Sequence, residues 1–273
     1  MQLPSRKIIL SIFPGIDLLG RAFEEAGFCV LRGPDPLWGG NIQDFHIPPG
    51  RIDGIIGGPP CQDFSAARRS ITDTGKGIKL IKEFARCVTE AKPAWWLMEN
   101  VPRVPTLIIT GYNTKRIDIT DKECGGPTLR RRHFQFGHRQ GEPWPIIDSH
   151  VTNLQPKPTA TASEGKRGNQ RRSWPEFCRL QGLPESFDLP GFTIQEKYRA
   201  VGNGVSMFTG RKIAGAIAEM EGNKRNEWFE MAPCGCGCGR TITTKYGRRF
   251  ALTACRKRAE RQRKGLKKTI TYP

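Results

Sequence analysis

The segment GGPPCQDFS, residues 57–65, places a cysteine, Cys61, directly after two glycines and two prolines. Proline fixes φ and lacks an amide hydrogen, so Pro59 and Pro60 limit how far this loop can relax. A stiff loop suits a thiolate nucleophile that must approach one carbon from a fixed direction. For a single cysteine, the ordinary alternative is a buried structural role.

A second segment supplies a carboxyl group with unusual surroundings. In AWWLMENVP, Glu99 stands at the end of a strongly apolar run and shortly before a proline. Desolvation at the mouth of such a strand raises the pKa of a carboxyl group, which makes Glu99 a candidate proton donor or hydrogen-bonding acid. A helix cap or a salt-bridged glutamate is the alternative.

A third segment, LRRRHFQFG, carries a run of cations in a strand-like pattern. On a strand, Leu129, Arg131 and His133 share one face, and Arg130 and Arg132 share the other. One face is expected to direct cations at an active site while the other meets phosphates. A charged edge strand would explain the same pattern without a site.

The elements that must hold these residues alternate along the first hundred positions. Strands are predicted at KIILSIF, CVLRG, RIDGIIGG and AWWLMEN, and helices at DLLGRAFEEAGF and GIKLIKEFARCVTEA. Two further helices are predicted at SWPEFCRLQGL and SMFTGRKIAGAIAEM. This rhythm predicts an α/β fold, a Rossmann-like doubly wound and mostly parallel sheet whose strand ends bind ligands.

The first strand leads into SIFPGIDLLG, which has features of a cofactor loop. Gly15 permits close backbone approach, and Phe13 can stack on a flat ring. Asp35 follows the next strand, twenty residues beyond Gly15, where an acid binds the ribose of nucleotide-like cofactors. An ordinary strand–turn–helix with a solvated Asp35 is the alternative.

The overall charge favours a polyanionic partner. Lys and Arg number 44 against 26 Asp and Glu, a net charge of +18, which favours nucleic acid although a generally basic protein would share it. No apolar run reaches the roughly 18 residues of a membrane span. The nine cysteines, with no secretion signal, predict reduced thiols in a cytosol.

Four of those cysteines cluster near the carboxyl end: Cys234, Cys236, Cys238 and Cys255. Four thiolates can hold a structural zinc ion and fold a small module, although unligated reduced thiols stay open because C-x-C-x-C is an unusual ligand spacing. The segment ACRKRAERQRKGLKK is expected to form a basic helix that contacts phosphates, with a disordered basic tail as the alternative.

These patterns divide the chain into four parts. Read with the family resemblance given next, they imply a cofactor-binding and catalytic core at residues 1–137, a short target-recognition region at 138–172, and the rest of the catalytic domain at 173–222. Residues 223–273 form the Cys-rich basic tail.

Five segments, taken together and in order, resemble the DNA cytosine-5 methyltransferase family in its compact bacterial or phage form. They are GGPPCQDFS, MENVP, RRRHFQFG, WPEFCRLQGLPESF and AVGNGV, and the resemblance covers about residues 7–220. It implies transfer of a methyl group from S-adenosylmethionine to C5 of a cytosine flipped out of double-stranded DNA. Cys61 would attack C6, Glu99 would hold or protonate N3, and Arg131 would steady the base and the cysteine loop.

The resemblance also implies binding residues. The cofactor pocket is expected to involve Phe13, Pro14, Gly15, Asp35, Asn41, Pro60 and Asn203. Contacts with nucleic acid are expected from Gln62, Ser65, Arg130, Arg132 and His133. We expect a monomer in the cytoplasm of a bacterium or phage-infected cell, in the setting of restriction-modification.

The chain departs from the family pattern at several positions. Ser11 stands where the family carries an acid, Asp17 replaces a glycine, and Asn41 replaces an acid near the adenine. Leu129 and His133 stand where Gln and Arg are common. The short target-recognition region keeps RNA cytosine methylation open as an alternative, and the altered cofactor segments keep open a DNA-binding relative without turnover.

Overall fold

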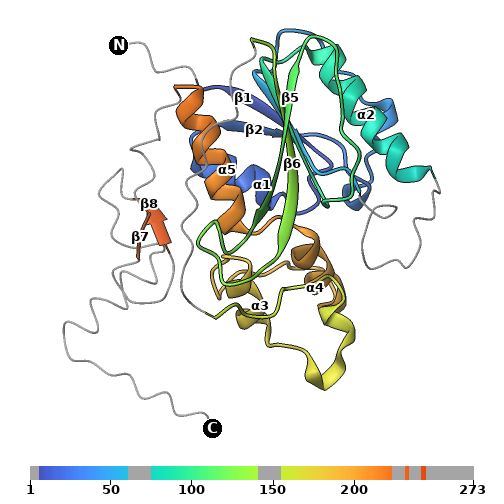
Figure 1. The fold of residues 1–273 in the computed structure, drawn as a ribbon. Helices are drawn as coiled ribbons and strands as arrows, with labels where there is room; N and C mark the ends of the chain where they lie inside the picture. Colours follow the sequence, from blue (N-terminus) through green and yellow to red (C-terminus); the bar gives the residue numbers. More distant parts are fainter. Residues whose placement is uncertain (1–5, 61–74, 141–154, 223–230, 234–240, 244–273) are drawn as a thin grey trace.

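A computed structural model of the chain describes residues 6–60, 75–140 and 155–222, together with the backbone of residues 231–233 and 241–243. The main body is a six-stranded sheet with helices on both of its faces (Figure 1).

The sheet has the strand order β2-β1-β3-β4-β6-β5. Its strands are β1 (Ile8–Ile12), β2 (Cys29–Arg32), β3 (Gly54–Gly57), β4 (Trp95–Asn100), β5 (Asn113–Thr120) and β6 (Arg131–His138). The first four are parallel, and β6 runs antiparallel to both β4 and β5. The predicted doubly wound and mostly parallel sheet is confirmed.

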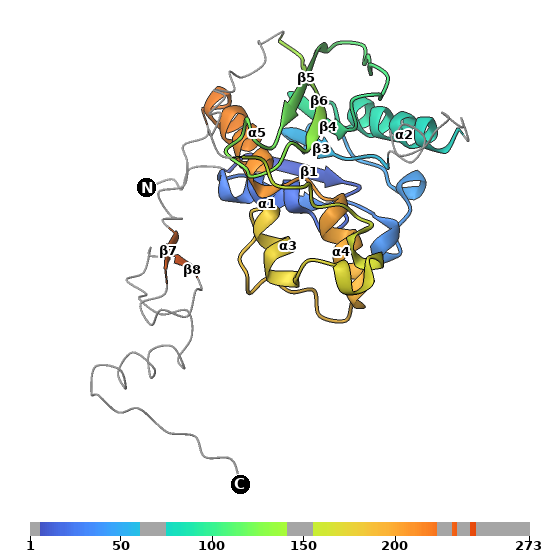
Figure 2. The same ribbon diagram turned by 60° about the horizontal axis from the view of Figure 1, so that its bottom comes forward.

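Two layers of helix cover the sheet. Helices α1 (Leu18–Glu25) and α5 (Met207–Met220) lie side by side on one face, and α2 (Lys76–Ala91) lies on the other (Figure 2). Each layer has its own core of buried apolar side chains. The sheet thus lies between two helix layers, as in a doubly wound fold. The layer of α1 and α5 joins two segments that are far apart in the sequence.

The two tryptophans of β4 show why the strand is apolar throughout. Successive side chains on a strand point to opposite faces, so Trp95 enters the core under α1 and Trp96 enters the core under α2. Both are fully buried. Glycines on the neighbouring strands make room, since a Cβ on Gly54 would lie 2.3 Å from Trp95 and one on Gly137 would lie 2.2 Å from Trp96.

The last third of the chain adds three helices beside the sheet. Helix α3 (Trp174–Leu180) and α5 agree with the two predicted helices, while α4 (Ile194–Asn203) was not predicted. A capping box begins α4, in which Thr193 and Glu196 exchange hydrogen bonds. The edge strand β5 was also not predicted.

Four short 3₁₀ turns complete the described body: η1 (Pro36–Trp38), η2 (Ile42–Asp44), η3 (Glu164–Lys166) and η4 (Gly168–Gln170). Beyond Gly222, strands β7 (Met231–Pro233) and β8 (Thr241–Thr243) pair antiparallel. The predicted basic helix after them lies outside the described residues. None of the helices in the described part of the chain is long and apolar enough to span a membrane.

Candidate active site

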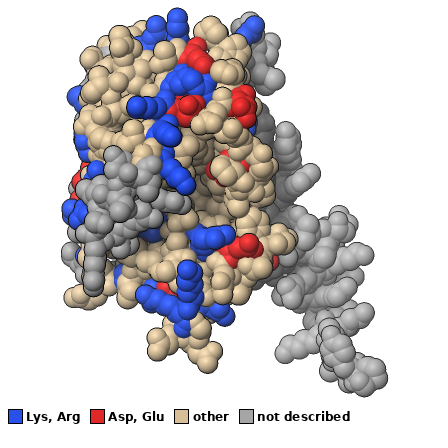
Figure 3. Space-filling view, turned by 90° about the vertical axis from the view of Figure 1, so that its right-hand side faces the viewer, with Lys and Arg blue, Asp and Glu red and all other residues tan. Residues whose placement is uncertain are grey.

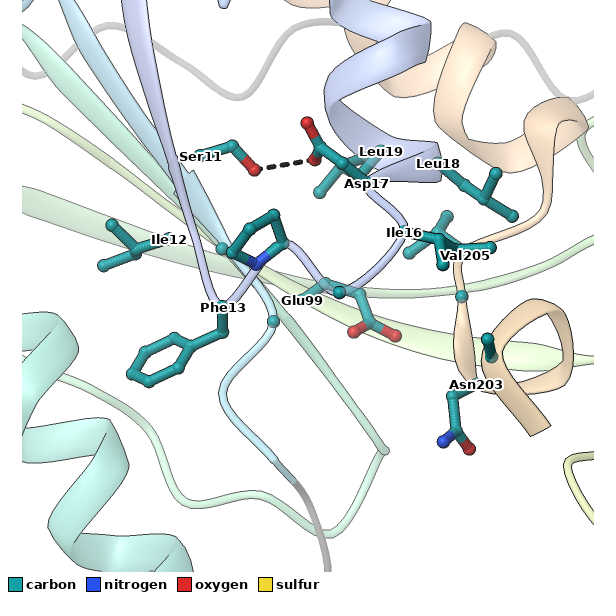
Figure 4. Close-up of a pocket in the computed structure, with 16 residues that line it drawn as sticks. Ser11, Ile12, Phe13, Ile16, Asp17, Leu18, Leu19, Glu99, Asn203 and Val205 are labelled. Atoms are coloured by element: carbon teal, nitrogen blue, oxygen red, sulfur yellow. Dashed lines mark hydrogen bonds between the residues drawn. The ribbon is translucent and has the colours of Figure 1, made fainter. Parts of the chain in front are cut away.

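A pocket opens where the order of the parallel strands reverses. Strand β1 has β2 on one side and β3 on the other, and ligands of such sheets bind outside the carboxyl ends at this point. The pocket encloses about 600 Å³, including the part open to solvent. Residues 11–19 supply one wall, Gly57, Gly58 and Glu99 the next, and Ala200 with residues 203–205 the third (Figure 4).

The loop after β1 keeps an unusual backbone. Phe13 and Gly15 have φ of 54° and 55°, a left-handed conformation that is costly for Phe13. Pro14 and Gly15 line the pocket, whereas the Phe13 ring is directed away from Asn203 and packs into the core under α2 (Figure 4). Phe13 therefore contributes to this wall without offering its ring for stacking.

Asp35 braces that loop from outside the pocket wall. Its carboxylate accepts a 2.9 Å hydrogen bond from the Gly15 amide and a 2.8 Å hydrogen bond from the Leu37 amide. The indole of Trp38 donates to the Gly15 carbonyl at 2.8 Å. Asn41 is exposed and bonds to Asp44, so it does not line the described pocket.

Asp17 brings a buried carboxylate to the start of α1. It caps the helix by accepting from Gly20 N at 3.0 Å, and it also accepts from Ser11 Oγ at 2.7 Å (Figure 4). Its other oxygen lies 2.8 Å from Arg32 Nε. Burial raises the pKa of Asp17 in spite of these partners. Position 11 carries no acid, but the Asp17 carboxylate reaches back to Ser11 and brings an acid to the same place. Asp17 does so from a left-handed backbone conformation, with φ of 54°.

Glu99 directs its carboxylate into the same pocket from the end of β4 (Figure 4). Burial raises its pKa, and the cations Arg132 and Arg130 oppose that rise. One oxygen lies 2.8 Å from Arg132 Nε, and a Cβ on Gly58 would lie 3.0 Å from the other. The expectation of a desolvated carboxyl at this strand end is met.

The structure pairs Arg132, rather than Arg131, with Glu99. Glu99 stands opposite Phe134 across the antiparallel pair, so the residue two positions before Phe134 reaches it diagonally from the same face. Arg131 lies on the other face and is exposed. The predicted alternation was correct in placing Arg131 on one face and Arg130 and Arg132 on the other. The face that meets the Glu99 carboxylate is that of Arg130 and Arg132.

Two of the residues expected at nucleic acid are instead buried. Arg130, 9% exposed, donates to the carbonyls of Ala160 at 2.7 Å, Gly202 at 2.6 Å and Gly204 at 3.2 Å. It therefore closes the carboxyl end of α4, where helix carbonyls lack partners. His133, 2% exposed, bonds to Asp118, and burial lowers its pKa. Neither side chain is available to a phosphate in this structure.

The loop that leads to the predicted nucleophile is described as far as Pro60. Asn100 Nδ2 donates to the carbonyl of Pro59 at 3.1 Å, which ties the loop to the end of β4 beside Glu99. Pro60 is exposed. Asn100 was not predicted as a site residue, although it directly follows Glu99 in the sequence.

Several predicted site residues lie outside the described residues. They are Cys61, Gln62 and Ser65 of the loop, and the proposed zinc ligands Cys234, Cys236, Cys238 and Cys255. Within the described ranges, no group of three or more His, Cys, Asp or Glu side chains could hold a metal ion. Asn203, by contrast, is described and lines the pocket.

Fold and site together define a doubly wound α/β protein with a ligand pocket at the strand-order reversal and two carboxylates in its wall. The sequence profile of the family "C-5 cytosine-specific DNA methylase" matches residues 39–167. The Type II methyltransferase M.HgiGI of Herpetosiphon aurantiacus is 49% identical over 114 residues, which are 34% of this chain and 90% of that protein. The chain belongs to this family.

Two further similarities cover a larger share of this chain. The Type II methyltransferase M.HgiDI, also of Herpetosiphon aurantiacus, is 32% identical over 162 residues, 48% of this chain. The matched part spans about half, 52%, of the length of that relative. The structure of the Entamoeba histolytica methyltransferase EhMeth superposes with a TM-score of 0.60 at 16% identity, covering 80% of this chain and 99% of that one. This last likeness supports the fold.

Proposed function

We propose that this protein is an S-adenosylmethionine-dependent DNA cytosine-5 methyltransferase. The observation that carries the proposal is Glu99, a desolvated carboxyl group that shares the strand-edge pocket with the start of the loop leading to Cys61. Family membership agrees with it, since the relatives are named Type II methyltransferases.

The described pocket fits the cofactor by its chemistry. S-adenosylmethionine carries a sulfonium and an ammonium group, and the carboxylate-bearing residue Asp17 lies in the pocket wall. Gly57 and Gly58 offer backbone without side chains, so a ligand can approach the main chain closely there. Pro14, Gly15 and Asn203 would hold the cofactor within this wall. When bound, it supplies an electrophilic methyl group.

The protein residues would prepare the cytosine. The Cys61 thiolate adds to C6, and Glu99 donates a hydrogen bond or proton to N3, which makes C5 nucleophilic. Arg132 holds the Glu99 carboxyl, and the role of Arg131 at the base and the cysteine loop stays a prediction. After methylation at C5, loss of the C5 proton restores the double bond and expels the thiolate. The target must leave the helix to reach these groups.

We infer double-stranded DNA as the partner and the cytoplasm of a bacterium or phage-infected cell as the setting, with the protein acting as a monomer. The zinc module of the tail remains a proposal, to be tested by metal analysis of the purified chain. The net charge of +18 supports the polyanionic partner.

Methyl transfer from labelled S-adenosylmethionine to a mixed-sequence duplex tests the proposal, with 5-methylcytosine identified by mass spectrometry. We expect label in 5-methylcytosine with the unmodified protein and none with Glu99→Ala. Arg51→Ala, on the exposed loop before β3, is a matched control that should keep its activity. Label on RNA alone, or no label with folded protein and bound cofactor, would contradict the proposal.

A further inference from the structure

Two consecutive 3₁₀ turns, η3 and η4, project beside α4 at the lower end of the molecule in Figure 1, in yellow. We call residues 165–171 the finger. Its exposed residues are Lys166, Arg167, Gly168, Asn169 and Gln170. Two cations and two amides thus face solvent on a protrusion that carries no exposed acid.

The base of the finger is fixed by a buried carboxylate. Glu164 is fully buried and accepts from Arg172 N, Nε and Nη2, each at 3.1 Å. Arg172 also donates to the carbonyls of Pro158 at 2.9 Å and Thr159 at 3.1 Å. The Glu164–Arg172 pair therefore joins both ends of the finger, which lowers the ordering entropy lost when the finger binds a partner. Arg167 Nη1 also lies 3.7 Å from Glu164, but about half of the Arg167 side chain stays exposed to solvent.

The finger stands on the same helix that forms part of the pocket wall. A Cβ on Gly165 would lie 3.0 Å from Gln195 Cα, so the finger packs closely against the first turns of α4. Asn203 at the other end of α4 lines the pocket. With a rise of about 1.5 Å per residue, the two points are separated by roughly 12 Å along the helix, about three to four base pairs of DNA.

The surroundings of the finger are basic. In Figure 3, Lys and Arg side chains form a broken band down the face that is the right-hand side of Figure 1, with some Asp and Glu side chains beside it, and the band reaches the lower end of the molecule. Arg171 at the end of the finger lies over the Tyr198 ring, with the guanidinium carbon 5.5 Å from the ring centroid. A polyanion that follows this face would meet the finger.

The finger side chains suit double-stranded DNA. Lys and Arg contact phosphates, and Asn and Gln can bond in a bidentate manner to the N6 and N7 edge of adenine in the major groove. We propose that the finger contacts DNA a few base pairs from the flipped cytosine. Lys166 and Arg167 hold phosphates, and Asn169 and Gln170 contact base edges. This inference rests on the proposed function and assigns part of its target recognition.

The phosphate contacts are tested by the salt dependence of binding to a mixed-sequence 30-base-pair duplex, measured with the full chain by fluorescence anisotropy. The double variant Lys166→Ala/Arg167→Ala should reduce the slope of log Kd against log salt by about 2, roughly one per phosphate contact. The matched control, Arg51→Ala/Lys92→Ala, removes two exposed cations from the loops before β3 and β4, at the amino ends of these strands. It should leave the slope unchanged.

The base contacts are tested by mapping methylated cytosines on plasmid DNA. Asn169→Ala and Gln170→Ala should relax the preference for a base near the target cytosine by roughly 5- to 150-fold while methylation continues. An unchanged slope in the double variant, with unchanged sequence preference in the single variants, would overturn the proposal. So would a slope change for RNA alone. If the unmodified protein methylated no DNA, the proposed function would fail. The salt dependence of duplex binding would still show whether the finger contacts DNA.

Discussion

Arg130 gives the sharpest test of how the site is held together. Its guanidinium is buried between β6 and the end of α4, where it donates to main-chain carbonyls on two separate segments. A side chain in this position supports the wall that carries Asn203. An arginine that contacted phosphates would instead be expected on the surface.

The magnitude follows from the contacts. A hydrogen bond from a charged donor contributes about 1.5 kcal/mol or more, and carbonyls left buried without a donor carry a further penalty. With three such bonds, Arg130→Met should lower the free energy of unfolding by about 4 kcal/mol. For a domain of this size, that corresponds to a fall in Tm of roughly 8 to 16 °C. Arg130→Lys should lose about half as much, because an ammonium group cannot reach all three carbonyls in a fork.

Thermal unfolding and duplex binding, measured on the same samples, separate the two roles. Arg131→Met is the matched control, since Arg131 is the exposed neighbour on the same strand and should change the free energy of unfolding by less than about 0.5 kcal/mol. If an Arg130 variant melted like the unmodified protein while the salt slope of DNA binding fell by about one, the structural role given to the buried Arg130 would be refuted.

Three further predictions concern the pocket. Because burial raises the pKa of Glu99, its protonated form persists to higher pH, and kcat should fall as the pH rises through that pKa. Glu99→Gln should lower kcat by roughly 10²- to 10⁴-fold and should remove this fall from the pH–rate profile. Asp17 has a left-handed φ of 54°, which strains any residue but glycine. Both Asp17→Ala and Asp17→Gly lose the helix cap, but only Asp17→Ala keeps the strain, so it should be about 1 kcal/mol less stable than Asp17→Gly by denaturant titration. Equal stabilities of the two variants would exclude backbone strain at this position. A Cβ on Gly202 would lie 2.6 Å from the amide nitrogen of Ala162, so Gly202→Ala should lower the free energy of unfolding by about 1 to 3 kcal/mol. It should also weaken cofactor binding measured by calorimetry. Arg199→Ala, on the exposed side of α4, is the control and should change neither quantity.

Much of the parallel sheet could be predicted because its signals are local. The runs around β1, β3 and β4 are apolar on both faces, and the helix between β3 and β4 has a clear 3.6-residue period. Glu99 could be recognised for the same reason, since a carboxyl group at the end of a buried strand is desolvated wherever the strand lies in the sheet.

The elements that were missed have weaker or non-local signals. Strand β5 lies at the edge of the sheet, and mostly exposed polar residues separate its few apolar ones, so its apolar pattern is short. Helix α4 is polar on average, and its clearest signal was the pair Thr193 and Glu196, which together form a capping box. That spacing is visible in the sequence and could have located the helix.

The assignment of the arginines depended on tertiary register. Strand alternation separates Arg131 from Arg130 and Arg132, but it cannot tell which face meets Glu99. The antiparallel pairing of β4 with β6 decides this, and it is a contact between residues more than thirty positions apart. The burial of Arg130 likewise depends on Ala160 and Gly202, which only the folded chain brings together.

The measurement that tests the central claim most directly uses duplex DNA containing 5-fluorocytosine, incubated with the full chain and S-adenosylmethionine. Fluorine at C5 blocks the final loss of a proton, so a working enzyme remains covalently attached to its target base. The account predicts a denaturation-resistant adduct that is absent in Cys61→Ser and strongly reduced in Glu99→Gln. If the folded protein bound this DNA and cofactor tightly but formed no adduct, or if the adduct persisted in Cys61→Ser, the proposed chemistry would be contradicted.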